Sequence, residues 1–584
     1  MTFISEKVIE TKQCKHCDTK FEITDKDIEF YEKVSPVFAW KKYLIPSPTL
    51  CPDCRFQNRQ SFINERHLYK RKSDATWKEI ISNYSPDKPY KVFESEIWLA
   101  SNDFDKYGKE FDFSKSFFEQ YNELFLQVPR MSLDQWANIE SSSYNNYVDD
   151  LKDCYMCFNA VWAKSCYHTS YNFNSNDCVD CLISHDNIES YELVSCKKWY
   201  KLYFSQNCES CSESYFLKDC INCKDCMFCV NLSWKQYCIF NIQYSKLEYN
   251  TKKLELIKEL QINKQKSINN FQEFKEKNIV KNLNIVNSEY CTWDEIINSK
   301  NIKQSFLVSD SENVAYSFNA VEAINCYDCD GFWIEKSYYN LVTWGRSQNC
   351  LFCIAWWENC SNLIYSDYCF FNCSNLFWCI WLKNKSYCIL NKQYTKEEYE
   401  ILVPKIIEHM IEEWDPTSPR FRGIWWWEFF PSSISPFWYN ETVAQEYFPL
   451  TKEESEKKWF NWSTYETAFP NVDKIIPANM LPENIADIPD DILNWAIESE
   501  LESTEGFSPL YRIIKQELEF YRKHNLPIPK RHPNQRHLDR MNLRNPRKIY
   551  ERKCDKCGID INTTYSPDRK ELVYCKECYE KEVY

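Results

Sequence analysis

The stretch that decides the fold is DCYMCFNAVWAKSCYHTSYNFNSNDCVDC, residues 153–181, in which cysteines recur at multiples of three residues. The same beat continues to residue 238, and DCINCKDCMFC at residues 219–229 carries four cysteines at consecutive three-residue steps. Thirteen cysteines share one remainder on division by three: Cys154, Cys157, Cys166, Cys178, Cys181, Cys196, Cys208, Cys211, Cys220, Cys223, Cys226, Cys229 and Cys238. Chance would produce this about twice in a million, so the stretch is a repeat.

Aligned every twelve residues, the repeat separates into columns of one side-chain type. One column contains Ser142, Cys154, Cys166, Cys178 and Ser190, and the next contains Tyr155, Tyr167, Tyr191, Tyr203 and Tyr215. Strand side chains alternate with a period of two, so inward positions three residues apart need a corner between them. We therefore predict a parallel β-solenoid with coils of roughly 40 Å perimeter, in which small Cys side chains fill the interior and aromatic columns stack coil on coil.

The corners of such coils need residues that enter the left-handed region, and the chain has only 6 Gly. Asp or Asn precedes many of the cysteines: Asp153, Asp177, Asn207, Asp219, Asp225, Asn325, Asn349, Asn359 and Asn372. Asn and Asp adopt left-handed conformations more readily than other side chains. The scarcity of glycine is therefore compatible with a solenoid.

The ladder occurs twice in the chain. The segment at residues 158–161, FNAV, recurs at 318–321, a shift of 160 residues, and later the shift is 150. Each copy ends at a capping box, Ser245-x-x-Glu248 and Thr395-x-x-Glu398. These boxes predict a helix at the end of each solenoid.

The run Cys220, Cys223, Cys226 and Cys229 also invites an iron–sulfur interpretation. The bacterial ferredoxin run has its fourth Cys after three intervening residues and then Pro, whereas here the three-residue beat continues and Val230 follows. We prefer core filling for these cysteines, with extra zinc or a cluster as the alternatives.

Two four-cysteine patterns stand near the ends of the chain. The first is Cys14, Cys17, Cys51 and Cys54, and the second is Cys554, Cys557, Cys575 and Cys578. Two C-x-x-C knuckles complete a closed tetrahedron around zinc and leave no open position for catalysis. We predict two structural zinc ions.

The two ends are copies of one another at a shift of 481 residues. The run Tyr84-Ser-Pro-Asp87 coincides with Tyr565-Ser-Pro-Asp568, and several Arg residues coincide as well. Ser73 then faces Cys554, while Cys51 and Cys54 face His532 and Gln535. We interpret this as an ancestral module with two metal sites, of which each copy kept a different one, so His532 is expected to be a relic.

Both copies carry a basic run, with a net charge of +5 over residues 55–72 and +7 over residues 530–553 in a chain of net charge −14. The candidate residues for nucleic-acid contact are Arg55, Arg59, Arg66, Arg71, Lys72, Arg536, Arg540, Arg544, Arg547, Lys548, Arg552 and Lys553. Such segregation beside zinc modules is a typical footprint for phosphate contacts on RNA or DNA. The alternative is a solvated face that pairs with the acidic middle of the same chain.

Composition argues against common enzyme classes and for a cytoplasmic location. Isolated glycines exclude the Gly-rich phosphate loops and the G-x-S-x-G elbow, and there is no H-E-x-x-H motif, so we predict no enzyme. The chain start has no apolar signal region and no run reaches the ~18 apolar residues of a membrane span. The 31 Cys are then expected to be ligands or buried thiols rather than disulfides. Trp425-Trp426-Trp427, with Phe429, Phe430, Phe437 and Trp438, is expected to be core rather than a base-stacking platform.

Several segments together resemble one group of proteins. They are PTLCPDCR at residues 48–55, YKRKSD at 69–74, YSPDKPY at 84–90, the repeated Asp-Cys-x-x-Cys and the closing CDKCG at 554–558. Over almost the whole chain they look like the large zinc-ribbon-ended, Cys-repeat proteins of Candidate Phyla Radiation (Patescibacteria) bacteria. The resemblance implies zinc ribbons and a cytoplasmic bacterial setting, and it implies no particular activity. His532 and Gln535 depart from the CPxC pattern of the group, which argues against a second C-terminal metal site.

The predicted fold is multidomain and mainly β with helical linkers: two short-coil parallel β-solenoid (β-helix-like) arrays flanked by terminal zinc-ribbon or treble-clef-like modules. The expected domains are an N-terminal zinc module (1–100), a helical connector (101–140), the first solenoid (141–245), a helical insert (246–300), the second solenoid (301–394), an aromatic-rich helical connector (395–505) and a C-terminal zinc-ribbon module (506–584). The expected function is a non-enzymatic zinc-binding scaffold that contacts RNA, DNA or a ribonucleoprotein through its basic faces. The alternatives are a protein–protein scaffold that uses the acidic, aromatic-rich solenoid surface and, last, a metal or redox protein.

Overall fold

The computed structural model describes residues 6–412, 427–465, 469, 471–500 and 509–583. The chain divides into two compact units, and each is built from two separate segments. Unit 1 combines residues 1–132 with 283–463, and unit 2 combines residues 133–282 with 464–584. Each terminal module therefore belongs to one unit with the repeat that is farther from it in sequence order: the N-terminal module with the second ladder and the C-terminal module with the first.

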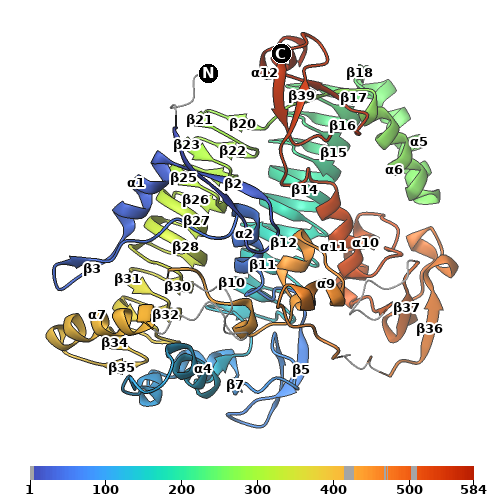
Figure 1. The fold of residues 1–584 in the computed structure, drawn as a ribbon. Helices are drawn as coiled ribbons and strands as arrows, with labels where there is room; N and C mark the ends of the chain where they lie inside the picture. The colour runs from blue at the N-terminus through green and yellow to red at the C-terminus, as the bar shows by residue number, and fades with distance from the viewer. Residues whose placement is uncertain (1–5, 413–426, 466–468, 470, 501–508, 584) are drawn as a thin grey trace. The chain divides into compact units, whose positions relative to one another are not determined.

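The first ladder forms a stack of parallel strands in unit 2, here called coil stack 1 (residues 139–243, Figure 1). Its strands are β9 (Ile139–Glu140), β10 (Asn146–Lys152), β11 (Phe158–Lys164), β12 (Ser170–Phe173), β13 (Asn176–Val179), β14 (Leu182–Gln206), β15 (Ser212–Lys218), β16 (Lys224–Val230), β17 (Gln236–Ile239) and β18 (Ile242–Gln243). Asn146 pairs with Phe158, Phe158 with Ser170 and Ser170 with Leu182. This is the twelve-residue step that the Cys ladder predicts.

A left-handed residue occurs at every third position of coil stack 1, from Asn138 to Phe240. All nine Asp and Asn corners predicted from the sequence have positive φ. Bulky residues such as Trp162, Ile183 and Phe204 also adopt the left-handed conformation, with φ of 53–54°. A left-handed L-residue costs roughly 1–2 kcal/mol, so the hydrogen bonds and packing between coils must offset many such costs.

At many corners the next residue is a buried Cys or Ser whose side chain donates to the backbone across that corner. The Sγ atoms of Cys154, Cys166 and Cys178 each donate to the carbonyl oxygen two residues earlier, at 3.3 Å. Ser205 and Ser214 make the same bond, at 2.9 and 2.7 Å. A small donor therefore suits these positions, because it fills the narrow interior and satisfies a buried carbonyl at once.

The second ladder forms coil stack 2 (residues 285–393) in unit 1, with less regular coils. Its strands are β20 (Ile285–Val286), β21 (Glu289–Cys291), β22 (Ile296–Ile297), β23 (Lys300–Lys303), β24 (Phe306–Ser309), β25 (Glu312–Ala315), β26 (Phe318–Val321), β27 (Ile324–Phe332), β28 (Ile334–Trp344), β29 (Ser347–Gln348), β30 (Ile354–Trp357), β31 (Ser361–Ile364), β32 (Asp367–Phe370), β33 (Ser374–Phe377), β34 (Ser386–Ile389) and β35 (Lys392–Gln393). The parallel step is twelve residues from Phe306 to Phe318, eleven from Ile324 to Glu335 and thirteen from Ile354 to Asp367. Aromatic side chains stack along it, as in Phe352, Tyr365 and Trp378, with ring centroids 4.8 and 4.3 Å apart.

Both stacks end at the helices that the capping boxes predict. In unit 2, Ser245 and Glu248 cap α5 (Lys246–Ile262), which is followed by α6 (Lys264–Glu276). In unit 1, Thr395 and Glu398 exchange the same two hydrogen bonds at the start of α7 (Lys396–Glu412). The last pairing in each stack, β17–β18 and β34–β35, is antiparallel.

The remaining elements belong to the terminal modules and connectors. Unit 1 contains β1 (Val8–Gln13), β2 (Lys20–Thr24), α1 (Asp25–Val34), β3 (Val37–Phe38), β4 (Lys41–Lys42), α2 (Pro52–Gln60), β5 (Tyr69–Lys72), β6 (Glu79–Ser82), β7 (Val92–Phe93), α3 (Ser95–Ala100), α4 (Phe117–Gln127), β8 (Arg130–Met131), α8 (Val443–Tyr447) and α9 (Lys452–Lys457). Unit 2 contains β19 (Ile279–Lys281), β36 (Lys474–Pro477), β37 (Trp495–Glu498), β38 (Leu510–Tyr511), α10 (Lys515–Lys523), α11 (Pro533–Asn542), β39 (Tyr550–Lys553), β40 (Asp560–Thr563), β41 (Leu572–Tyr574) and α12 (Lys576–Val583).

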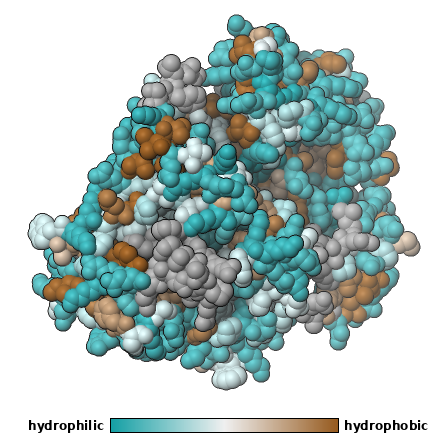
Figure 2. Space-filling model, in the orientation of Figure 1, coloured by the Kyte–Doolittle hydropathy of each residue, from teal (hydrophilic) through white to brown (hydrophobic). Residues whose placement is uncertain are grey.

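The aromatic segment of the connector is mostly core where the structure describes it, with Trp438 half-buried. Trp427, Phe429, Phe430 and Phe437 are buried, and Phe429 stacks on Tyr339 of coil stack 2 at 5.1 Å. Trp425 and Trp426 lie outside the described residues. Among the described helices, none is long and apolar enough to cross a membrane. Hydrophilic residues predominate on the face drawn in Figure 2.

Candidate metal centres and the residues around them

The N-terminal cysteines meet between a hairpin turn and the start of a helix. Cys14 and Cys17 lie in the turn that joins β1 to β2, Cys51 is the N-cap of α2, and Cys54 lies in its first turn. The four sulfur atoms lie within 4.8 Å of one another, with Cys17 Sγ 3.6 Å from Cys51 Sγ. The predicted ligand set is therefore confirmed as a four-thiol cluster that could hold one metal ion.

The C-terminal cysteines form the same arrangement. Cys554 and Cys557 lie in the turn between β39 and β40, and Cys575 and Cys578 lie at the start of α12. Their four sulfur atoms also lie within 4.8 Å of one another. In both clusters the first thiol of the hairpin accepts a backbone N–H from the first helix cysteine, at 3.3 Å in Cys14 and 3.2 Å in Cys554.

The backbone around Cys554 favours the thiolate that a metal needs. Burial raises the pKa of this thiol, but N–H groups of Cys557, Cys575 and Lys556 point at the sulfur and lower it to about 6. Neighbouring thiols of Cys51 and Cys54 likewise lower the pKa of Cys14. Four soft thiolates in tetrahedral range suit zinc in a closed, structural site.

A third knuckle with the same backbone occurs in unit 1 but has no cysteines. Shifted by 481 residues, the ligand positions of the C-terminal cluster are Ser73, Thr76, Glu94 and Ile97. The Asp74 N–H bonds to the Val92 carbonyl at 2.8 Å, as the Asp555 N–H does to the Val573 carbonyl at 3.0 Å. Trp77 has a φ of 62° where Gly558 has 75°. The hairpin and the following helix therefore share backbone features with the C-terminal knuckle although they carry no cysteines.

Hydrogen bonds to one carboxylate hold this third knuckle together. The hydroxyls of Ser73 and Thr76 each donate to a different oxygen of Glu94. Burial raises the pKa of Glu94, but these two bonds outweigh that effect and lower it. A charged carboxylate thus links the hairpin turn to the helix start, where Cys575 contributes a thiol in the other copy.

Arg55 and Arg59 of α2, two of the candidate residues for nucleic-acid contact, are buried against coil stack 2. Each side chain is at most 1% exposed, and their guanidinium groups lie 2.8 and 3.0 Å from the two oxygens of Asp328. Arg59 also lies 3.5 Å from Asp330. These two arginines therefore form ion pairs inside unit 1 and do not contribute to its surface.

Arg536 and Arg540 of α11 make the equivalent contact in unit 2. Both pair with the fully buried carboxylate of Asp180 in coil stack 1, and Arg540 Nη1 lies 2.8 Å from it. Arg536 also lies 3.3 Å from Glu517 of α10. Burial raises the pKa of Asp180, but the two arginines outweigh it and hold that pKa below its usual value. For these four arginines, pairing within the chain replaces the predicted phosphate contact.

The other predicted basic residues are divided between interior and surface. Arg66 is buried. Arg71 donates to the carbonyls of Ser85 and Tyr90, and Arg552 makes the equivalent bonds to Ser566 and Glu571. Arg544 and Arg547 are partly exposed, and Lys72, Lys548 and Lys553 are exposed. Lys553 lies 2.7 Å from Asp560.

His532 has a structural position that fits its interpretation as a relic. It is the N-cap of α11, and its Nδ1 accepts the Asn534 N–H at 3.1 Å. Cys51 is the N-cap at the corresponding point of α2. In both copies a proline follows the N-cap, Pro52 in the first and Pro533 in the second. The residue thus caps the helix, and among the described residues His532 belongs to neither cluster of potential metal ligands.

The ladder cysteines are free thiols, and nearly all are buried. Burial raises the pKa of Cys178, Cys208 and Cys379 well above the ordinary value, so these thiols stay protonated. Within the described part of the chain, the two terminal clusters are the groups whose ligand atoms converge on one point. The core-filling interpretation of the ladder therefore has structural support.

The carboxylates that receive the arginines were missed by sequence reasoning. Asp180 and Asp328 occupy left-handed corners with φ of 55° and 54°, like the exposed corner acids. Their burial depends on α11 and α2, which lie more than 250 residues away in sequence. The one available signal was the equal spacing of the two Arg pairs, Arg55/Arg59 and Arg536/Arg540, which puts each pair on one face of a helix.

No protein family, curated protein or solved structure matches this chain.

Proposed function

We propose that the protein is a non-enzymatic scaffold of two β-solenoids, each with a terminal module that carries one structural zinc ion. The arginine–aspartate contacts carry this proposal. In both units a helix of the terminal module carries two arginines that form ion pairs with one buried corner aspartate of a coil stack. Such buried pairs fix the register of two elements rather than serve a reaction.

The metal role follows from the ligand chemistry. A closed set of four thiolates leaves no coordination position for a substrate or a catalytic water. The zinc ions would hold the hairpin and helix of each module together, in a treble-clef-like arrangement. A cytoplasmic, reducing compartment would suit the many free thiols of the coil stacks.

Because four of the arginines form buried ion pairs within the chain, we favour a protein partner over nucleic acid. Of the twelve predicted basic residues, Lys72, Lys548 and Lys553 are exposed. Coil stack 1 instead presents Trp162 and Trp234 at its corners, 62% and 78% exposed. Exposed Trp is enriched among the residues that dominate protein–protein binding energy.

A salt titration with a defined nucleic acid tests this choice. We expect a 20-nucleotide RNA or DNA to bind the purified protein only weakly at about 50 mM salt and not at about 200 mM. Tight binding that weakens steeply with salt, and that drops on replacing Lys72, Lys548 and Lys553 by Gln, would instead favour the nucleic-acid function.

A further inference from the structure

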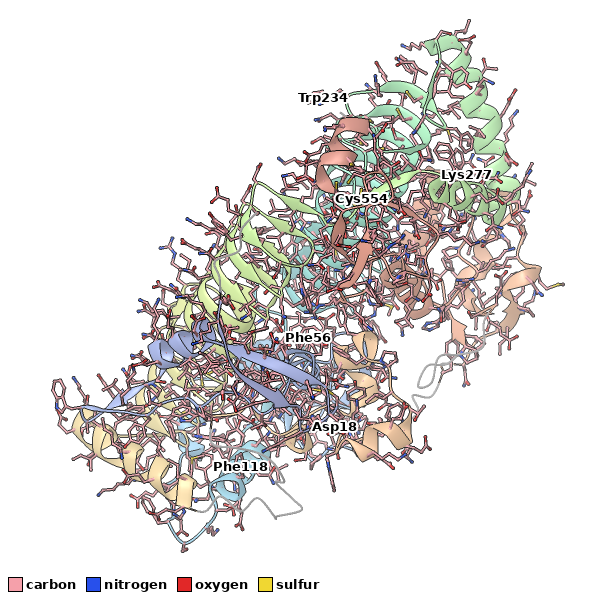
Figure 3. All side chains as sticks on the ribbon, turned by 45° about the horizontal axis from the view of Figure 1, so that its top comes forward. Asp18, Phe56, Phe118, Trp234, Lys277 and Cys554 are labelled. Carbon is pink, nitrogen blue, oxygen red and sulfur yellow. The ribbon has the colours of Figure 1, made fainter. Side chains whose placement is uncertain are left out.

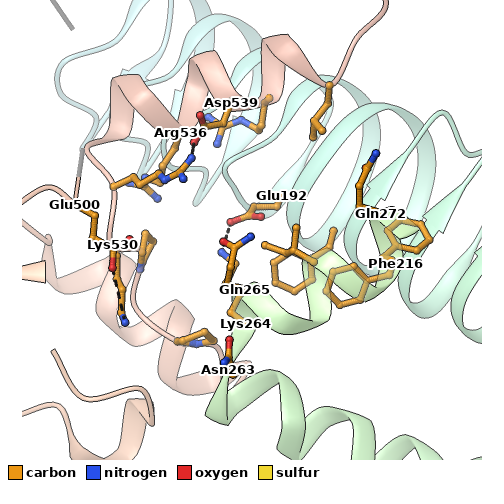
Figure 4. Close-up of a pocket in the computed structure, with 18 of the residues that line it drawn as sticks. Glu192, Phe216, Asn263, Lys264, Gln265, Gln272, Glu500, Lys530, Arg536 and Asp539 are labelled. Carbon is orange, nitrogen blue, oxygen red and sulfur yellow. Dashed lines mark hydrogen bonds and ion pairs between the residues drawn. The ribbon is translucent and has the colours of Figure 1, made fainter. Parts of the chain in front are cut away.

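A cavity of 570 Å³ lies within unit 2, between α6, coil stack 1 and residues 527–543 (Figure 4). One face of α6 forms a wall, with Lys264, Ile268, Phe271 and Lys275 at positions i, i+4, i+7 and i+11. At 1.5 Å per residue this wall is about 16 Å long. The cavity can therefore hold an elongated small molecule rather than a single ion.

Most of the wall between the two lysines is apolar. Phe204 and Phe216 of coil stack 1 are stacked with ring centroids 4.7 Å apart, and Phe271 meets Phe216 edge-on at 5.6 Å. Ile528, between two prolines, lines the opposite side. Burial of an alkyl chain or a ring against these groups is favourable by roughly 25 cal/mol per Å².

Most charges at the cavity are already neutralised. Lys264 forms an ion pair with Glu192 (Figure 4), with its Nζ 2.5 Å from the carboxylate, and Arg531 lies 2.7 Å from Asp539. Lys530 pairs with Glu483 and lies 3.9 Å from Glu500. Arg536 and Arg540 are held by Asp180.

Lys275 is the exception among the lining cations that the structure describes. Its Nζ lies 3.4 Å from Gln206 Oε1 and 5.1 Å from the centre of the Phe271 ring, and no described carboxylate lies within ion-pair distance. Among the described lining residues, Lys275 is thus the one cation without a carboxylate within ion-pair distance, and it lies at one end of an apolar wall.

We propose that this cavity binds an amphipathic monoanion, with an alkyl or aryl body along Phe204, Phe216 and Ile268 and a carboxylate on Lys275. The pattern of an apolar pocket with one placed charge is that of a small-molecule site. It is independent of the two zinc clusters and of the partner proposed above.

The titration of Lys275 supports the assignment. Burial, with a smaller contribution from the nearby Lys218, lowers its pKa to about 8, while Asp219, Glu571 and Glu276 act in the opposite direction. A bound carboxylate would raise this pKa, so anion binding should be strongest below pH 8 and weaken above it.

The experiment uses the zinc-loaded full chain and isothermal titration with 2-naphthoate, decanoate and the neutral 2-naphthalenemethanol. Lys275→Met removes the cation. Ile268→Trp fills part of the cavity and leaves Lys275 in place. Lys277→Met is the matched control, because Lys277 is exposed just beyond the end of α6 (Figure 3).

We expect at least one of the two acids to bind at one site per chain. Its affinity should fall about tenfold or more in Lys275→Met. Ile268→Trp should abolish binding, and Lys277→Met should leave it unchanged. Preference between the acids distinguishes an aryl from an alkyl ligand. Absence of saturable binding by either acid, equal affinity in Lys275→Met, or equal affinity for the neutral alcohol would each overturn the proposal.

Discussion

At the scale of single residues, the inward position of each coil is chosen by both size and hydrogen bonding. Cys178 is fully buried, and its thiol reaches the carbonyls of Asn176 and Asn187 at 3.3 and 3.7 Å. Ser takes the same position elsewhere and also accepts the N–H one coil later, as Ser214 does from Cys226 at 2.9 Å. This explains why Cys and Ser occupy most positions of that column, where Leu202 is the one larger residue.

We therefore expect Cys178→Ser to be tolerated and Cys178→Leu to be destabilising. Ser keeps the donor to the Asn176 carbonyl and should change the free energy of unfolding by less than about 1 kcal/mol. Leu overfills the coil and should cost about 1–3 kcal/mol. Urea unfolding measures both, and equal stability of the two variants would contradict the narrow-interior account.

The buried aspartates are a second residue-scale test. Asp328→Asn removes the carboxylate that buried Arg55 and Arg59 share and leaves Asp330 as the ion-pair partner of Arg59, which should cost about 3–5 kcal/mol. Asp180→Asn should do the same to Arg536 and Arg540. Asp310→Asn is the matched control, since Asp310 is an exposed corner acid. Thermal unfolding that does not separate Asp328→Asn from Asp310→Asn would show that the clamps do not stabilise the fold.

The depressed pKa values of Asp180 and Glu517 predict a pH dependence in unit 2. For Glu517, burial raises the pKa, but His168 and Arg536 outweigh it. Both acids have lower pKa values folded than unfolded, so their stabilisation is present above about pH 4 and is lost as the pH falls further. Below that range the unfolding free energies of wild type and Asp180→Asn should converge; a constant gap down to pH 2 would contradict this assignment.

At the scale of elements, the backbone of a knuckle forms with or without its four cysteines. The hairpin β5–β6 and helix α3 keep the hydrogen bonds of β39–β40 and α12, with Glu94 taking over the link between turn and helix. The sequence alignment that places Ser73 opposite Cys554 is consistent with this geometry. A carboxylate with two hydroxyl donors is thus a metal-free substitute for four thiolates.

Restoring the cysteines should restore a metal site. We expect the fourfold variant Ser73→Cys, Thr76→Cys, Glu94→Cys and Ile97→Cys to bind one zinc more than wild type, because the backbone already has the geometry of the C-terminal cluster. Ser73→Cys alone, the control, should add none. Elemental analysis of both variants decides, and an unchanged metal content in the fourfold variant would mean that the two knuckles differ in more than their side chains.

The repeats were predictable from sequence because each coil repeats the same local rule. The three-residue beat fixed the corners, the small inward column and the twelve-residue step, and the capping boxes fixed the helix starts. The eleven- and thirteen-residue coils around Ile324 and Ile354 were not predicted, because the second ladder has fewer cysteines to mark its register.

At the scale of the whole molecule, long-range pairing was beyond sequence reasoning. Nothing local distinguishes Asp328 from other corner acids, and nothing local assigns the N-terminal module to the second ladder rather than to the first. The structure joins them through α2, whose start carries Cys51 and Cys54 and whose next turns carry Arg55 and Arg59. One helix therefore links the candidate metal to the coil stack.

The account as a whole requires metal at the two terminal clusters and none in the ladders. Elemental analysis of the purified full chain, combined with its visible absorption spectrum, tests this most directly. We predict two zinc ions per chain, no iron and no absorption in the visible range. More than two bound metals, or any iron with a visible charge-transfer band, would contradict the account and make the ladder cysteines ligands rather than the filling of the coils.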